Sequence, residues 1–109
     1  MKVVWSEQAG KSLRVTAAYV RSKFGAQAKQ NLLKEVAQTA LLLESSPYMG
    51  IVEPLLEGCE VEYRSIVVNK LNKIIYYISA GSVEITAFWD TRREPQRQAE
   101  EMINRQTFD

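Results

Sequence analysis

The spacing of apolar residues divides the chain into two helical segments followed by three strand-like segments. From residue 7 to residue 24 apolar side chains recur every three or four positions, and a second stripe of this kind runs from residue 28 to residue 43. This periodicity predicts two amphipathic helices. Between residues 62 and 90, runs rich in β-branched and aromatic residues are separated by short polar breaks that hold Asn69, Asn72 and Gly81. Such runs and breaks predict consecutive hairpins, and therefore an antiparallel meander.

Local signals predict where the first elements begin and end. Residues 1–5 are apolar at Val3, Val4 and Trp5 and predict a short strand, which must join the meander to be stable. Ser6 is a natural N-cap for the first helix, because its hydroxyl can accept from an amide that the first turn leaves unpaired. Gly25 separates the two helices, which we therefore expect to form an antiparallel hairpin.

The second helix is predicted to stop at Ser45-Ser46-Pro47, because proline disfavours helical geometry in the residue before it. Residues 48–59 hold two glycines and a proline and predict a loop. Pro95 suits the first turn of a short C-terminal helix. Strict alternation in the third strand predicts one face made of Val83, Ile85, Ala87 and Trp89, and another made of Glu84, Thr86, Phe88 and Asp90.

These elements together predict an α+β fold in a single domain over residues 1–109. The expected sheet has about four strands, the N-terminal strand and the C-terminal three-stranded meander, and a helical hairpin covers one face of it. A chain of 109 residues has room for one core. No apolar run is long enough to cross a bilayer and no signal segment begins the chain, so a soluble, cytoplasmic protein without membrane contacts is expected.

The composition excludes several kinds of chemistry. The sequence contains no histidine, so a Ser/His/Asp triad, a Cys/His pair and an imidazole zinc site are all excluded. The single cysteine, Cys59, has no thiol partner for a disulfide or a metal site. We therefore expect no metal and no cofactor, and any acid–base chemistry must come from lysine, tyrosine, a carboxylate or water.

The net charge of +1 hides an uneven distribution. Residues 1–36 and 64–93 are basic, whereas residues 37–63 hold five glutamates and no basic residue. A basic meander beside an acidic connection indicates a groove for a polyanion. Solvated faces that happen to segregate explain the same distribution, and charge alone does not separate these two interpretations.

The meander also carries a family resemblance. Tyr63-Arg64 opens its first strand, Lys-Ile-Ile-Tyr (73–76) lies in its second, and Phe-Trp-Asp-Thr-Arg-Arg-Glu-Pro (88–95) ends its third. In this order, and with Val-Val-Trp-Ser (3–6) at the N-terminus, these pieces resemble the RelE/ParE superfamily of bacterial toxins over nearly the whole chain. The resemblance implies a RelE-like fold and the toxin of a type II toxin–antitoxin system, with a cognate antitoxin protein as its partner.

The RelE side of this superfamily implies a metal-independent endoribonuclease that cleaves mRNA held in the ribosome. There the ribose 2′-hydroxyl attacks the adjacent phosphate, and basic residues stabilise the charge that develops. Arg64, Lys73 and Arg92 occupy the corresponding strand positions, and the meander is expected to gather them on one side of the sheet as catalytic residues. The RNA-binding residues predicted around them are Lys70, Arg93, Arg97 and Tyr76.

Two further functions stay open. Ribonuclease members place a tyrosine or a histidine after the last strand, and this chain has no histidine and no tyrosine after Tyr77. That absence favours a ParE-like inhibitor that binds DNA gyrase without catalysis, whereas Arg64, Lys73 and Arg92 favour RNA. A degenerate member that only binds its antitoxin is the third hypothesis. Trp89 is expected in the core, and Tyr76 and Tyr77 on opposite faces of the sheet.

Overall fold

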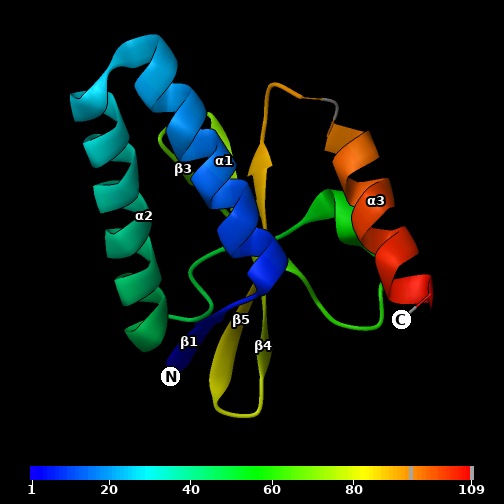
Figure 1. The fold of residues 1–109 in the computed structure, drawn as a ribbon. Coiled ribbons are helices and arrows are strands. Elements are labelled where there is room, and N and C mark those ends of the chain that lie inside the picture. The colour runs from blue at the N-terminus through cyan, green and yellow to red at the C-terminus, as the bar shows by residue number, and fades with distance from the viewer. Residues whose placement is uncertain (94, 109) are drawn as a thin grey trace.

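A mixed β-sheet of five strands carries helices on both faces (Figure 1). The computed structural model describes residues 1–93 and 95–108. The strands lie in the order β1-β5-β4-β3-β2, with β1 parallel to β5 and every other pair antiparallel. The α+β prediction is confirmed, and its elements in chain order are β1 (Lys2–Trp5), α1 (Glu7–Phe24), α2 (Ala26–Ser45), β2 (Ile51–Val52), the short 3-10 helix η1 (Pro54–Leu56), β3 (Arg64–Val68), β4 (Asn72–Ser79), β5 (Ser82–Asp90) and α3 (Pro95–Phe108).

The helical hairpin forms where the sequence predicts it. The Ser6 hydroxyl accepts a hydrogen bond from the Ala9 amide at 3.0 Å, so it caps α1 as expected. Gly25 has a φ of 96°, a left-handed conformation that favours glycine, and it joins α1 directly to α2. Both helices pack on the same face of the sheet (Figure 1). Phe24, the last residue of the apolar stripe predicted over residues 7–24, is instead 65% exposed, because it lies at the turn that joins the two helices.

Each face of the sheet has its own hydrophobic core. The larger core lies under the hairpin and includes Leu32, Val36, Ile74 and Tyr76. The smaller core lies on the opposite face and joins η1 and α3 to the sheet through Leu56, Tyr63, Ile75, Ala87, Trp89, Ala99 and Met102. Trp89 is 5% exposed, so its predicted place in the core is confirmed. The sheet is thus covered on both faces, whereas the sequence indicated one.

A bulge in β5 changes which of its residues share a face. Ile75 lies opposite Ala87, but the next residue, Tyr76, lies opposite Ile85, so Thr86 is an extra residue that no β4 residue lies opposite. Val83 and Ile85 therefore face the hairpin together with Phe88, whereas Ala87 and Trp89 face α3. The predicted division of this strand by strict alternation is wrong, because one extra residue reverses the alternation after it.

Residues 48–59, predicted as a loop, contain β2 and η1. β2 pairs with the start of β3 and forms the edge strand, so the sheet has five strands where about four were expected. Two residues are too few to show a strand periodicity in a sequence. A backbone hydrogen bond of 2.8 Å from the Glu53 amide to the Tyr63 carbonyl, directly beside the two paired residues, stabilises this pairing.

Candidate functional site

The three basic residues predicted to share a site do not converge. Arg64 lies opposite Tyr76, whose side chain is in the core under the hairpin. Lys73 lies opposite Trp89, whose side chain is in the core on the α3 side. Because paired residues project to the same face of a sheet, Arg64 and Lys73 project to opposite faces. The expected single cluster is therefore wrong, and a catalytic role of these residues stays a prediction.

Arg92 lies far along the sheet from Arg64. It follows Asp90, which pairs with Asn72 at the start of β4, whereas Arg64 pairs with Tyr76 four positions along that strand. Each residue adds about 3.3 Å of length along a strand. In addition, β5, which ends just before Arg92, is separated from β3 by β4. The guanidinium groups of Arg64 and Arg92 therefore do not lie near each other.

Each of the three cations already has a carboxylate partner. Arg64 donates to the Gly50 carbonyl at 2.8 Å and to Glu62 at 2.9 Å, and its guanidinium lies 5.0 Å from the centre of the Tyr48 ring. Arg92 donates from Nε to Oδ1 of Asp90 at 3.2 Å and from Nη2 to Oδ2 at 3.3 Å. These contacts give both arginines structural roles, at the 47–50 turn and at the end of β5.

Lys73 forms the most buried of these ion pairs. Its Nζ lies 2.7 Å from Oε1 of Glu53, a side chain that is 1% exposed. Oε2 of Glu53 accepts from the Leu55 amide at 3.0 Å and so caps η1. Burial raises the pKa of Glu53, but hydrogen bonds from the Leu55 amide, Lys73 and Ser65 outweigh it, so the pKa is lowered overall. Glu53 and Lys73 together fasten the 53–56 segment to β4.

The lowered pKa of Glu53 predicts that the free energy of unfolding depends on pH. Because the pKa of folded Glu53 is lowered, its contribution is complete above the unfolded value of about 4.3 and is lost as the pH falls through the folded value. We expect the Glu53→Gln variant to be less stable than wild type at neutral pH and to lose less stability on acidification over that window. Urea unfolding at a series of pH values measures the slope of the free energy of unfolding against pH for each protein. Equal slopes in the two proteins would contradict the assignment.

Tyr76, predicted to bind RNA, is inaccessible. It is 0% exposed, and its hydroxyl donates to the Pro47 carbonyl at 2.8 Å and accepts from the Gly50 amide at 3.0 Å. Burial raises its pKa, an effect that the Gly50 amide and Arg64 partly offset. Base stacking by Tyr76 is therefore a wrong prediction, whereas the opposite orientations of Tyr76 and Tyr77 are confirmed by their places in different cores.

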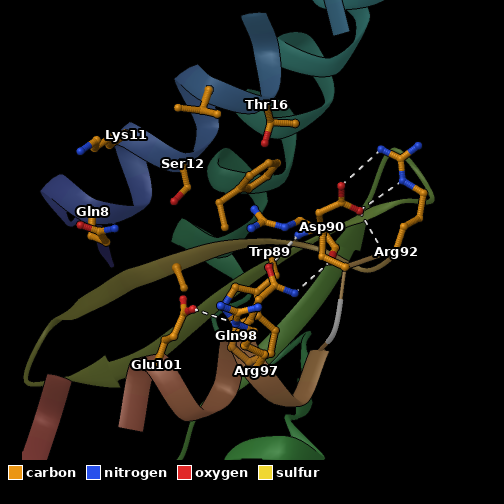
Figure 2. A pocket seen from close by; sticks show the side chains of 14 residues that line it. Gln8, Lys11, Ser12, Thr16, Trp89, Asp90, Arg92, Arg97, Gln98 and Glu101 are labelled. Atoms are coloured by element: carbon orange, nitrogen blue, oxygen red, sulfur yellow. Dashed lines mark hydrogen bonds and ion pairs between the residues drawn. The ribbon is translucent and has the colours of Figure 1, made fainter. Parts of the chain in front are cut away.

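Of the other predicted RNA-binding residues, two lie together and one is apart. Lys70 is exposed in the turn between β3 and β4, where it has a φ of 62°. Arg93 and Arg97 line a groove of about 530 Å³ between α1, the end of β5 and α3, and Arg92 lies there too (Figure 2). This groove is the one place where several of the predicted basic residues meet among those that the structure describes.

Residues that sequence reasoning did not assign to a site also line this groove. They include Lys11 and Ser12 on α1 and Gln98 on α3 (Figure 2). Lys11 falls outside the apolar stripe of its helix, a position that indicates exposure to solvent but does not identify a contact. The meeting of α1 with the end of β5 depends on tertiary packing, so no local signal identifies it.

Asp90 and Arg92 set the charge at the upper end of this groove. Burial raises the pKa of Asp90, but hydrogen bonds from the side chain and backbone of Arg92 outweigh it, so the pKa is lowered overall. The same carboxylate raises the pKa of Arg92. Both groups are therefore ionised at neutral pH, and they offset each other's charge. Within residues 1–93 and 95–108, no group of three or more His, Cys, Asp or Glu residues is placed to hold a metal ion.

Comparison with known proteins identifies the family. Residues 3–95 match the ParE toxin of type II toxin-antitoxin system, parDE. The chain belongs to the ParE toxin family. None of the curated proteins matches it. Among twelve matching chains of solved structures, one from the chromosomal ParDE TA system of P. aeruginosa has a TM-score of 0.68 at 11% identity, covering 83% of this chain and 95% of that one.

Family membership confirms the predicted superfamily and makes this ParE-family chain a toxin of a type II toxin–antitoxin system. An antitoxin partner follows from that system. The similarity to the P. aeruginosa chain shows the fold, which is the α+β architecture described above. In the part of the chain that the structure describes, no helix is both long and apolar enough to span a bilayer.

Proposed function

We propose that this ParE-family toxin inhibits DNA gyrase by binding it, without catalysis of its own. The observation that carries the proposal is the dispersal of Arg64, Lys73 and Arg92. Arg64 and Lys73 project to opposite faces of the sheet, and Arg92 follows Asp90, whose partner Asn72 lies four positions along β4 from the partner of Arg64. The ParE family supports the same choice between the hypotheses that the sequence left open.

Cleavage of RNA requires groups that act on one phosphate at the same time. Cations that stabilise the developing charge must lie within hydrogen-bond reach of it. Lys73 is held by Glu53 at 2.7 Å, and Arg64 is held by Gly50 and Glu62, so neither is placed for a phosphate beside Arg92. Tyr76 is buried, and the sequence holds no histidine, so neither of these supplies a proton donor or acceptor there.

Two assays on the purified toxin separate this proposal from ribosome-dependent cleavage. We expect the toxin to block supercoiling by gyrase and to leave mRNA intact in a reconstituted translation reaction. The Arg92→Ala variant serves as the test of catalysis, because Arg92 is exposed and its loss leaves the core unchanged. Lys34→Ala on the outer side of α2 is the matched control for loss of one surface charge.

Messenger RNA cleavage that Arg92→Ala abolishes and Lys34→Ala preserves would overturn the proposal in favour of a ribonuclease. Failure in both assays by a correctly folded toxin would favour a chain that only binds its antitoxin. Supercoiling inhibition that survives Arg92→Ala is the expected result.

A further inference from the structure

The groove between α1, the end of β5 and α3 carries an excess of positive charge on its walls (Figure 2). Lys11 lies on α1, Arg93 just before α3 and Arg97 in the first turn of α3, and all three residues are exposed. Among the ion pairs between described residues, none involves Lys11 or Arg93. These two cations can therefore meet an anion from another molecule without breaking a described ion pair.

The carboxylates that line the groove are already paired, and so is the backbone at the end of β5. Asp90 accepts from Arg92 through its two side-chain oxygens, at 3.2 and 3.3 Å, and Glu101 lies 3.6 Å from Arg97. Gln98 accepts from the Asp90 amide at 3.3 Å and donates to the Asp90 carbonyl at 3.0 Å. These contacts close the end of β5 to an added strand, and a ligand that enters the groove meets mainly hydrogen-bond donors.

One side of α1 adds neutral donors to these cations. Gln8, Ser12 and Thr16 follow one another at intervals of four residues, so they lie on the same side of the helix, and all three line the groove (Figure 2). Carboxamide and hydroxyl groups can donate hydrogen bonds to an anion although they carry no charge. The groove thus combines charged and neutral donors, which is the combination that proteins use to hold the phosphates of a nucleic acid.

The aromatic residues that line the groove are not accessible to a ligand. Phe88 and Trp89 are each 5% exposed, because their side chains belong to the two hydrophobic cores. Of the described apolar residues in the lining, only Val15 is exposed. Single-stranded nucleic acids are held largely by stacking of bases on exposed aromatic rings, and protein partners by apolar and aromatic anchors in a buried centre. The groove therefore suits contacts with a nucleic-acid backbone better than either of these.

We propose that this groove binds the phosphodiester backbone of duplex DNA. Lys11, Arg93 and Arg97 supply positive charge to the phosphates, and Ser12 and Thr16 supply neutral donors. Such contacts hold the backbone without reading the bases, so the binding is independent of DNA sequence. The proposal deepens the proposed function and rests on it for the source of the DNA, which is the segment that gyrase holds.

Binding of the full-length toxin to a fluorescent DNA duplex of about 20 base pairs tests the groove without gyrase, by anisotropy at a series of salt concentrations. We expect a Kd on the order of 10 μM near physiological salt, which is typical of sequence-independent binding. Arg93→Gln combined with Arg97→Gln should weaken binding by about tenfold. It should also make the slope of log K against log salt shallower by about two, because two phosphate contacts are lost.

Lys23→Gln combined with Lys34→Gln is the matched control. It removes the same charge at exposed positions outside the groove, so we expect less than about a twofold change in affinity and the wild-type salt slope. Equal losses of affinity in the control and in the Arg93/Arg97 variant would overturn the proposal. Tighter binding of an RNA duplex, of single-stranded RNA or of polyglutamate to the wild-type toxin would overturn it too, and would assign the groove to RNA or to an acidic protein.

A second experiment tests the source of the DNA. We expect the Arg93/Arg97 variant to need about tenfold more toxin than wild type or the lysine control to block supercoiling. Full inhibition by a variant that no longer binds the duplex, or loss of its binding to DNA-free gyrase, would overturn the assignment of gyrase-held DNA to this groove. A wild-type toxin that binds the duplex through the groove but leaves gyrase active would instead overturn the proposed function and support the groove as a DNA-backbone site.

Discussion

The Gly50→Ala variant is expected to lose about 3 kcal/mol or more of folding free energy. A Cβ at this position would lie 2.6 Å from the Tyr76 hydroxyl and 2.8 Å from the Ser65 carbonyl. Neither neighbour can move easily, because Tyr76 is fully buried and the carbonyl belongs to β3. The clash would also break the hydrogen bond from the Gly50 amide to Tyr76. Urea unfolding, followed by tryptophan fluorescence, measures the loss.

Gly10→Ala is the matched control for this experiment. Gly10 lies inside α1, and a Cβ there would meet only the terminal Nη1 of Arg14, at 3.4 Å. Because alanine is favoured over glycine in a helix interior, we expect this variant to gain up to about 1 kcal/mol. If Gly50→Ala costs no more than a surface substitution, about 0.5 kcal/mol, the packing of the 47–50 turn on Tyr76 is not what the structure describes.

The Lys73→Met variant is expected to lose about 2 to 3 kcal/mol. It removes the cation 2.7 Å from Glu53 and leaves a carboxylate that is 1% exposed without its counter-charge. Breaking a buried pair typically costs 3–5 kcal/mol, and we expect less here because the Lys73 side chain is 24% exposed and water screens the pair in part. The measurement is again urea unfolding at neutral pH.

A double-variant cycle shows that the loss comes from the pair. Glu53→Gln combined with Lys73→Met leaves no buried charge, so we expect it to be more stable than Lys73→Met alone. Lys34→Met on the exposed side of α2 makes the same substitution without a carboxylate partner and should change stability by less than about 0.5 kcal/mol. Additive losses in the cycle would show that Lys73 stabilises the fold independently of Glu53.

Both predictions concern residues 48–59, which the sequence predicted as a loop. Its shape depends on contacts with residues far along the chain: Tyr76 with Pro47 and Gly50, Arg64 with Gly50, and Lys73 with Glu53. All three predicted catalytic residues therefore have a described structural task. Arg92, which pairs with Asp90, also lines the groove between α1, the end of β5 and α3.

The elements of the fold were predictable because their signals are local. Apolar spacing, a serine N-cap and a glycine between helices placed α1 and α2, and β-branched runs with polar breaks placed β3, β4 and β5. The bulge at Thr86 left no such signal, because threonine suits a regular strand equally well. That one residue decides that Phe88, and not Trp89, shares the core of Val83 and Ile85.

By itself, the sequence determined the order of the elements, the helical hairpin, the superfamily and the absence of histidine chemistry, since each depends on residue type and short-range spacing. Only the tertiary structure decided which side chains meet. It separated Arg64 from Lys73 by strand pairing, buried Tyr76, and brought Lys11 and Gln98 to one groove beside the end of β5. The physical reason is that pairing register and helix placement are set by burial summed over the whole chain, whereas a sequence pattern reports only on neighbours within a few residues.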